Sequence, residues 1–232
     1  MKKILIIGVI ILSIFIIYLT TIDKKVYFLS LGDEIALGIT KQGYYEKNYN
    51  DYIKEYLENK NKLEIYINDY VTYGQRITDI INDINNNNEI EESNKTIKNA
   101  LIKADLITLS IGTNDIEALI DNQNKLTKID YNKIYKNINN IIIDLENLLK
   151  QIREYCKEDI ILIGLNINTK DEKLNEILNY TNEKFKEQSE KYNIKYIDRY
   201  ENNLEEKIYP TKEEYETIGN KIIEEINNNL LK

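Results

Sequence analysis

Short runs of β-branched and aromatic residues alternate with longer amphipathic segments over most of this chain. Five runs have the length and composition of strands: residues 26–31, 64–71, 105–111, 159–165 and 194–198. Five segments carry apolar residues at the spacing of a helix: residues 45–60, 93–103, 131–155, 171–192 and 212–231. This alternation is typical of a parallel sheet with helices on both faces. We therefore expect an α/β fold built on a five-stranded parallel sheet.

A single domain is expected over residues 26–232. The chain has 232 residues, of which 42% are hydrophobic, and this is enough for one sizeable core. Its 30% charged residues and single proline are typical of an ordered globular protein. Loops are expected at residues 85–88, where four asparagines follow one another, and at residues 116–130.

Residues 4–22 carry no charge and are almost entirely aliphatic or aromatic, and two lysines precede them. About 20 apolar residues are enough to span a bilayer as a helix. The run is followed neither by a small-residue cleavage pattern nor by a cysteine that could accept a lipid. Residues 1–25 are therefore predicted to form one uncleaved transmembrane helix, a single-pass anchor in the cell membrane. Its short basic tail favours a cytoplasmic N-terminus and an extracytoplasmic domain.

The chain contains no histidine, which excludes every Ser-His-Asp triad and removes the usual zinc ligand. Its single cysteine, Cys156, cannot form an intramolecular disulfide, and its charged neighbours favour an inert helix end. The absence of disulfides fits a bacterial envelope protein. Any chemistry in this protein is therefore done without imidazole.

The net charge is acidic. It is −8 for the whole chain, and because residues 1–25 hold four lysines and one aspartate, residues 26–232 carry −11. A surface of this sign repels phosphate backbones, so no nucleic-acid partner is expected.

Small and polar residues follow several of the predicted strands. Ligands of an open parallel sheet bind beyond the carboxyl ends of its strands, so these residues are candidates for a site. One block follows each of the first three strands, and a fourth precedes the last helix: Gly32-Asp33-Glu34, Gly74, Gly112-Thr113-Asn114-Asp115 and Glu206-Lys207-Ile208-Tyr209-Pro210. Each block alone is a weak signal, but four in this order are a much stronger one.

Together these blocks resemble those of the SGNH, or GDSL, hydrolase family, over essentially all of residues 26–232. In that family the serine of a "GDS" block is the nucleophile, and a glycine and an asparagine form the oxyanion hole. A "DxxH" pair before the final helix supplies the base. The resemblance implies a flavodoxin-like three-layer sandwich and esterase, lipase or carbohydrate-deacetylase activity.

Position by position, the oxyanion-hole residues of the family are matched in this chain, whereas its catalytic residues are not. Gly74 and Asn114 match the two oxyanion-hole positions. Glu34 stands where the nucleophilic serine would be, Glu206 where the aspartate would be, and Tyr209 where the histidine would be. The resemblance therefore implies an intact scaffold whose nucleophile and base are replaced.

A serine hydroxyl needs a base to take its proton before an oxyanion hole can stabilise the tetrahedral intermediate. Neither partner is present, and loss of both triad members leaves little catalysis. Our first interpretation is a catalytically degraded family member that acts as a binding or assembly domain at the envelope. In it, the amides of Gly74 and Asn114 hold Glu34, and Tyr209 fills the space of the histidine.

Three alternatives stay open. The first is an atypical esterase, lipase or carbohydrate-ester hydrolase, in which carboxyls of Glu34 and Glu206, with Asp33 and Asp115, do acid–base work and Tyr209 serves as acid. The second is a Mg²⁺ or Ca²⁺ site made of the same carboxyls, although no spaced calcium motif supports it. The third is another α/β protein such as a nucleotide binder, which the absence of any glycine-rich phosphate motif disfavours.

Simpler roles are open for the same residues. Asp33 and Asp115 can cap the starts of helices, Gly74 can be a turn glycine with positive φ, and Tyr209 can be a packing residue. We expect no cofactor and no resident metal. The expected partners are the membrane, through the N-terminal helix, and a small ester, a glycan or an envelope protein.

Overall fold

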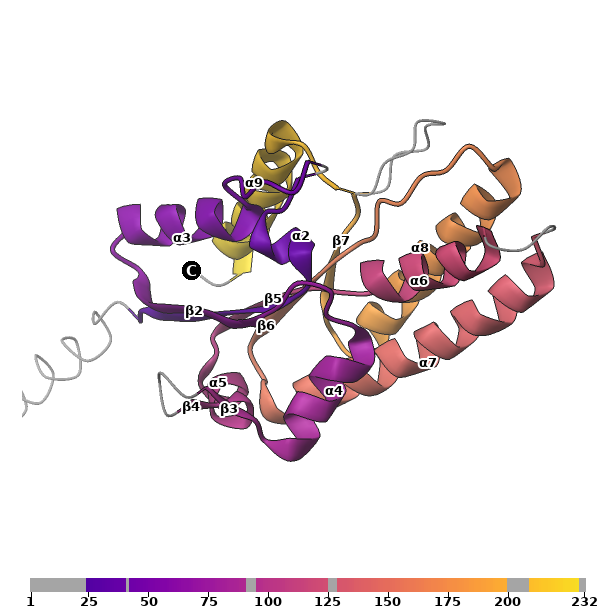
Figure 1. The fold of residues 1–232 in the computed structure, drawn as a ribbon. Coiled ribbons are helices and arrows are strands. Elements are labelled where there is room, and N and C mark those ends of the chain that lie inside the picture. The colour runs from indigo at the N-terminus through magenta and orange to yellow at the C-terminus, as the bar shows by residue number, and fades with distance from the viewer. Residues whose placement is uncertain (1–23, 41, 91–94, 125–128, 200–208, 230–232) are drawn as a thin grey trace, which may run out of the picture.

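The computed structural model describes residues 24–40, 42–90, 95–124, 129–199 and 209–229. Its centre is a five-stranded sheet in which all neighbouring strands pair in parallel (Figure 1). In their order across the sheet, the strands are β2 (Leu63–Val71), β1 (Val26–Gly32), β5 (Leu106–Ser110), β6 (Asp159–Ile163) and β7 (Lys195–Ile197). This is the flavodoxin-like strand order. The predicted α/β fold with a five-stranded parallel sheet is confirmed.

Helices cover both faces of the sheet and make three layers (Figure 1). One face packs against α2 (Glu34–Leu37), α3 (Tyr49–Asn59) and α9 (Lys212–Asn229). The other packs against α4 (Ile77–Asn86), α5 (Ile97–Lys103), α6 (Thr113–Asn124), α7 (Tyr131–Tyr155) and α8 (Glu172–Lys191). Alternate residues of a strand point to opposite faces, so Phe28 belongs to the first apolar cluster and Leu29 to the second. Both are fully buried, and the sheet thus separates two apolar cores.

A buried polar network ties α3 to the sheet. The Asn50 Nδ2 donates to Ser30 Oγ of β1 at 3.0 Å, and its Oδ1 accepts from Thr108 Oγ1 of β5 at 2.7 Å. All three side chains are buried, so each of these hydrogen bonds removes a desolvation penalty that the apolar core would otherwise impose.

The expected loops at 85–88 and 116–130 are partly wrong. Helix α4 runs through Asn85 and Asn86, and α6 occupies Thr113–Asn124. In α4, the buried side chains Ile77, Ile80 and Ile84 lie on one face, and their burial outweighs the low helix propensity of asparagine. Asn87 then ends α4 in the left-handed conformation, with φ of 52°.

Two expected helices begin later than predicted. Helix α3 begins at Tyr49 rather than at residue 45, because the Asn48 side chain accepts from the N–H of Asn50 and of Asp51 and forms a capping box. Helix α5 begins at Ile97 rather than at residue 93. Just before it, the short strands β3 (Glu89–Ile90) and β4 (Lys95–Thr96) pair as an antiparallel hairpin.

The predicted membrane anchor, residues 1–25, falls almost wholly outside the described residues. In the described ranges, which begin at residue 24, every helix is too short or too polar to cross a membrane. The anchor therefore stays a prediction.

The close pairing of β1 with β5 at Gly32 allows a test of stability. Gly32 has φ of +140°, and a Cβ added there would lie 2.1 Å from the backbone oxygen of Ser110. Gly32→Ala should therefore lower the free energy of unfolding by ~3 kcal/mol, since both the backbone and a packed neighbour must shift. Urea unfolding followed by circular dichroism measures this loss.

The matched control is Gly43→Ala. Gly43 also has a positive φ, +79°, but no atom lies within 4 Å of the position of its Cβ. Its substitution isolates backbone strain, at ~1 kcal/mol. Equal losses in the two variants would contradict the close approach at Gly32.

Candidate functional site

A sharp turn at the carboxyl end of β1 places Glu34 at the edge of the sheet. The backbone N–H of Asp33 donates to Ser110 O on the neighbouring strand at 3.0 Å. The Asp33 Oδ1 then accepts from Ile35 N at 3.1 Å and caps the one-turn helix α2. Glu34 is the first residue of α2, and only 1% of its surface is exposed. The suggested capping role of Asp33 is therefore what the structure shows.

The Glu34 carboxylate is held by two donors from distant parts of the chain. Its Oε2 accepts from the backbone N–H of Gly74 at 3.0 Å and from Asn114 Nδ2 at 2.9 Å. The Asn114 amide is fixed in turn, because the same nitrogen donates to Gln75 O at 3.1 Å. Gly74 has φ of +74° and makes the turn after β2. The structure thus brings Glu34, Gly74 and Asn114 together.

These two donors are the ones that the resemblance assigns to the oxyanion hole. Both distances are those of ordinary N–H···O hydrogen bonds, and such bonds are stronger when the acceptor is charged. A carboxylate oxygen therefore takes up both donors, in the place where an acyl hydrolase would stabilise a developing oxyanion.

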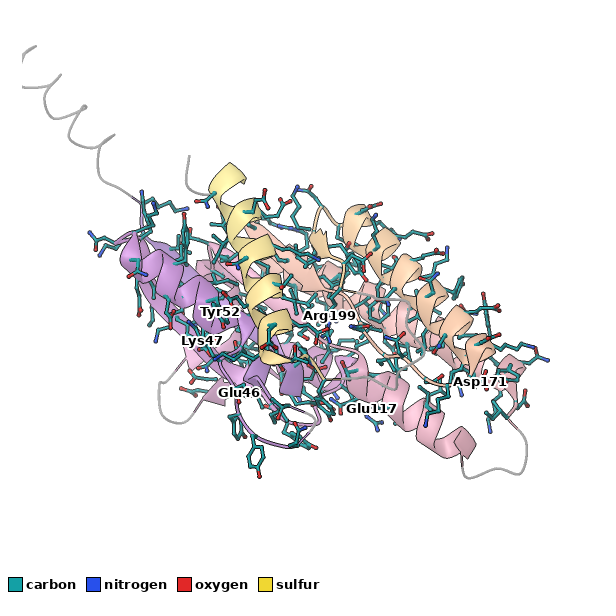
Figure 2. All side chains as sticks on the ribbon, turned by 90° about the horizontal axis from the view of Figure 1, so that it is seen from above. Glu46, Lys47, Tyr52, Glu117, Asp171 and Arg199 are labelled. Atoms are coloured by element: carbon teal, nitrogen blue, oxygen red, sulfur yellow. The ribbon has the colours of Figure 1, made fainter. Side chains whose placement is uncertain are left out.

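Asp33 is a second carboxyl directly behind Glu34. It is fully buried, and its Oδ1 also accepts from Ser110 Oγ at 3.3 Å. Burial, and then the negative charge of Glu34, raise the pKa of Asp33 to about 8, against the opposing effects of the Ile35 N–H and the Arg199 charge. Figure 2 shows Arg199 near the middle of the molecule, at the end of the segment that follows β7. Asp33 therefore holds a proton at neutral pH.

Tyr209 lies next to this carboxylate pair but cannot replace a histidine base. Burial, and then the charges of Glu117 and Glu34, raise the pKa of Tyr209 above the ordinary phenol value. A phenol that keeps its proton at neutral pH donates a hydrogen bond and does not accept a proton from a nucleophile. Tyr209 therefore cannot act as a general base at neutral pH.

A pocket of about 370 Å³ opens beside Glu34. Its lining residues are Ile39, Thr40, Gly43, Tyr45, Tyr73 and Tyr209. Two links tie it to Glu34, since Ile39 N donates to the backbone carbonyl oxygen of Glu34 at 3.0 Å and Tyr73 directly precedes Gly74, whose N–H donates to the Glu34 carboxylate. Sequence reasoning missed Tyr45 and Tyr73 as site residues. The available signal was their position in the sequence, since Tyr45 stands two residues after Gly43 and Tyr73 directly before Gly74.

The remaining candidates lie apart from this cluster or outside the described residues. Glu206 is outside them. The Asp115 Oδ2 accepts from Ile77 N at 3.2 Å and so caps the start of α4, as suggested. Within the described ranges, no three histidine, cysteine, aspartate or glutamate side chains are grouped to hold a metal ion.

The buried proton of Asp33 generates a prediction about stability and pH. A carboxyl whose pKa is raised by folding binds more protons folded than unfolded, so stability is greatest below the unfolded pKa and falls as the pH rises toward about 8. The expected slope is at most ~1.4 kcal/mol per pH unit. Urea midpoints of the wild type and Asp33→Asn between pH 4 and 9 measure it. The variant should lose this part of the pH dependence, and parallel curves would contradict the buried proton.

Comparison with known proteins supports the family assignment. Residues 30–216 match the sequence profile described as the GDSL-like Lipase/Acylhydrolase family. No curated protein sequence matches the chain significantly.

Solved structures share the fold at low sequence identity. The lipase Lip_vut3 from a goat rumen metagenome is 19% identical, with a TM-score of 0.66 over 85% of this chain and 95% of its own. The acetylxylan esterase Axe2 from Geobacillus stearothermophilus is 15% identical, with a TM-score of 0.64 over 88% and 95%. The lipase/acylhydrolase from Enterococcus faecalis is 18% identical, with a TM-score of 0.56 over 88% and 96%.

Identities this low show the fold alone. The catalytic mutants of Axe2 change a serine and a histidine, whereas this chain has no histidine. The fold, the order of the motifs and a profile match over most of the sequence agree. The chain belongs to the GDSL-like lipase/acylhydrolase family.

Proposed function

We propose that this chain is a membrane-anchored family member that has lost the serine-hydrolase reaction and acts as a binding or assembly domain at the cell envelope. One observation carries the proposal. The Glu34 carboxylate, at the nucleophile position, accepts hydrogen bonds from both Gly74 and Asn114. In this proposal a carboxylate takes the place of the nucleophile, and its hydrogen bonds occupy both oxyanion-hole donors.

Three physical arguments support the loss of the reaction. A carboxylate in this place competes with a substrate oxyanion for the same donors and repels its negative charge. Tyr209, at the base position, keeps its proton, and no histidine elsewhere in the chain can take its role. Removal of both nucleophile and base from a triad leaves only the small rate enhancement that oxyanion binding provides.

A second candidate function is ester hydrolysis by carboxyls, with Glu34 and Glu206 replacing the serine and histidine. The buried proton of Asp33 favours it, because a carboxyl that keeps its proton at neutral pH can serve as a general acid. Against it, Asp33 is fully buried and already bonded to α2 and Ser110.

Hydrolysis of a short-chain activated ester by the full-length chain in detergent separates the two candidates. If the reaction is lost, the wild type should match Glu34→Ala at the background rate. Glu34→Ser combined with Tyr209→His should restore turnover by at least tenfold, because the freed donors can then serve an oxyanion.

The single variants Glu34→Ser and Tyr209→His are the controls, and each should stay near background. Wild-type turnover that Glu34→Ala abolishes would contradict the proposed loss and support the carboxyl mechanism. In that case activity should also fall as the pH rises past about 8, where Asp33 loses its proton.

Residues 1–25 are proposed to hold the domain at the outer face of the cell membrane, as a single-pass anchor. Only a few residues separate the apolar run from β1, which begins at Val26, so the domain would lie close to the bilayer. Its net charge of −11 disfavours electrostatic binding to anionic lipid. A small ester, a glycan or an envelope protein is therefore the proposed partner.

Protease accessibility tests this location. Protease added to wall-stripped cells that produce the full-length chain should digest the domain, while a cytoplasmic marker stays intact. Both should be digested after detergent lysis. A domain that resists protease until lysis would place it in the cytoplasm and contradict the proposal.

A further inference from the structure

Exposed tyrosines gather at the pocket beside Glu34. Tyr45 is 71% exposed and Tyr73 66%, and the neighbouring Tyr44 is 71% exposed. Among the described residues, three of the six strongly exposed large hydrophobic side chains are these tyrosines. An exposed aromatic side chain costs hydration free energy, so a group of them around a cavity marks a binding surface.

The lining chemistry disfavours an acyl chain. Ile39 is the only aliphatic residue among the six that line the pocket, and Thr40, Gly43 and the tyrosine hydroxyls present polar atoms. Tyrosine offers a flat apolar face together with a hydrogen-bonding edge. Such a wall suits a ring with an apolar face and hydroxyl groups at its rim, which is the shape of a pyranose sugar.

The charge around the pocket indicates which class of sugar it favours. The Glu34 carboxylate accepts a hydrogen bond from Gly74 N, next to Tyr73, and its charge acts on the lining residue Tyr209. Glu117 lies about one helical turn after Asn114 on α6 (Figure 2), and its charge acts on the Tyr209 hydroxyl. None of the six lining residues is basic. A negative field beside aromatic rings attracts a cation and repels phosphate or sulfate.

We propose that this pocket binds an amino sugar with a free ammonium group, carried on a glycan chain. The tyrosine faces contact the ring, and the negative field of Glu34 and Glu117, which lie behind the lining residues, attracts the ammonium group without direct contact. This inference rests on the proposed binding role of the same site, and it names the ligand class.

Titration calorimetry with the full-length chain in detergent micelles provides the test. The two probes are a glucosamine oligomer and an N-acetylglucosamine oligomer of the same length, since acetylation removes the charge and keeps the ring. We expect the glucosamine oligomer to bind about tenfold more tightly, with the difference shrinking as salt is added. Equal affinities would overturn the role of charge, and absence of binding by either oligomer would overturn the sugar site. Choline binding as tight as that of the oligomer would overturn the role of the ring.

Matched variants locate the binding. Tyr73→Ala and Tyr45→Ala should each weaken binding of the glucosamine oligomer at least fivefold. Glu117→Gln should weaken it while leaving the weaker binding of the acetylated oligomer unchanged. Tyr135→Ala on α7 and Glu190→Gln near the far end of α8 are exposed controls and should change nothing. Unchanged affinity in both pocket tyrosine variants would overturn the assigned site.

The same proteins are assayed for ester hydrolysis, which separates the two proposals. Wild-type turnover together with selective glucosamine binding would refute the loss of catalysis and keep the ligand assignment. No turnover and no selective binding would refute the ligand assignment alone.

Discussion

The contact of one carboxylate oxygen with two amide donors organises this end of the molecule. Glu34 reaches Gly74 and Asn114, which follow different strands, and so joins the ends of β1, β2 and β5 in one cluster. Burial of a carboxylate costs free energy unless it is hydrogen-bonded, and the two donors provide these hydrogen bonds. The cluster thus stabilises its charge with the two groups that the resemblance to the family assigns to an oxyanion hole.

The approach to that contact depends on the close packing of β1 against β5. Gly32 lets the chain pass the Ser110 carbonyl, and Asp33 then caps α2 with an uncharged or weakly charged carboxyl. If Asp33 were ionised beside Glu34, two like charges would lie in a site from which water is excluded. The proton on Asp33 therefore lowers the cost of keeping Glu34 buried. The proton on Asp33 removes one negative charge from this pair of neighbouring carboxyls.

Sequence patterns predicted the sheet and the meeting of Glu34, Gly74 and Asn114, because the carboxyl ends of neighbouring parallel strands lie at one edge. They failed for α4 and α6, whose asparagine and aspartate residues conceal the buried isoleucines that hold these helices on the sheet. The tyrosine pocket was missed for another reason. Exposed side chains on loops have no periodicity, and only folding shows that Tyr45 and Tyr73 line one cavity. The raised pKa of Asp33 likewise depends on burial, which no local spacing encodes.

The burial of β1 along its whole length has a consequence for motion at the site. All seven of its residues are buried between β2 and β5, so its amides exchange with solvent only when the domain unfolds globally. Glu34 follows directly from this strand and shares its rigidity. The backbone of the segment that carries Tyr45 is also held in place, by hydrogen bonds from Glu46 N to Gly38 O at 2.8 Å and from the Tyr215 hydroxyl to Ile39 O at 3.1 Å. Motion at the pocket is thus expected from the exposed side chains of Tyr45 and Tyr73, on the picosecond-to-nanosecond timescale of rotamer changes, beside a carboxylate that does not move.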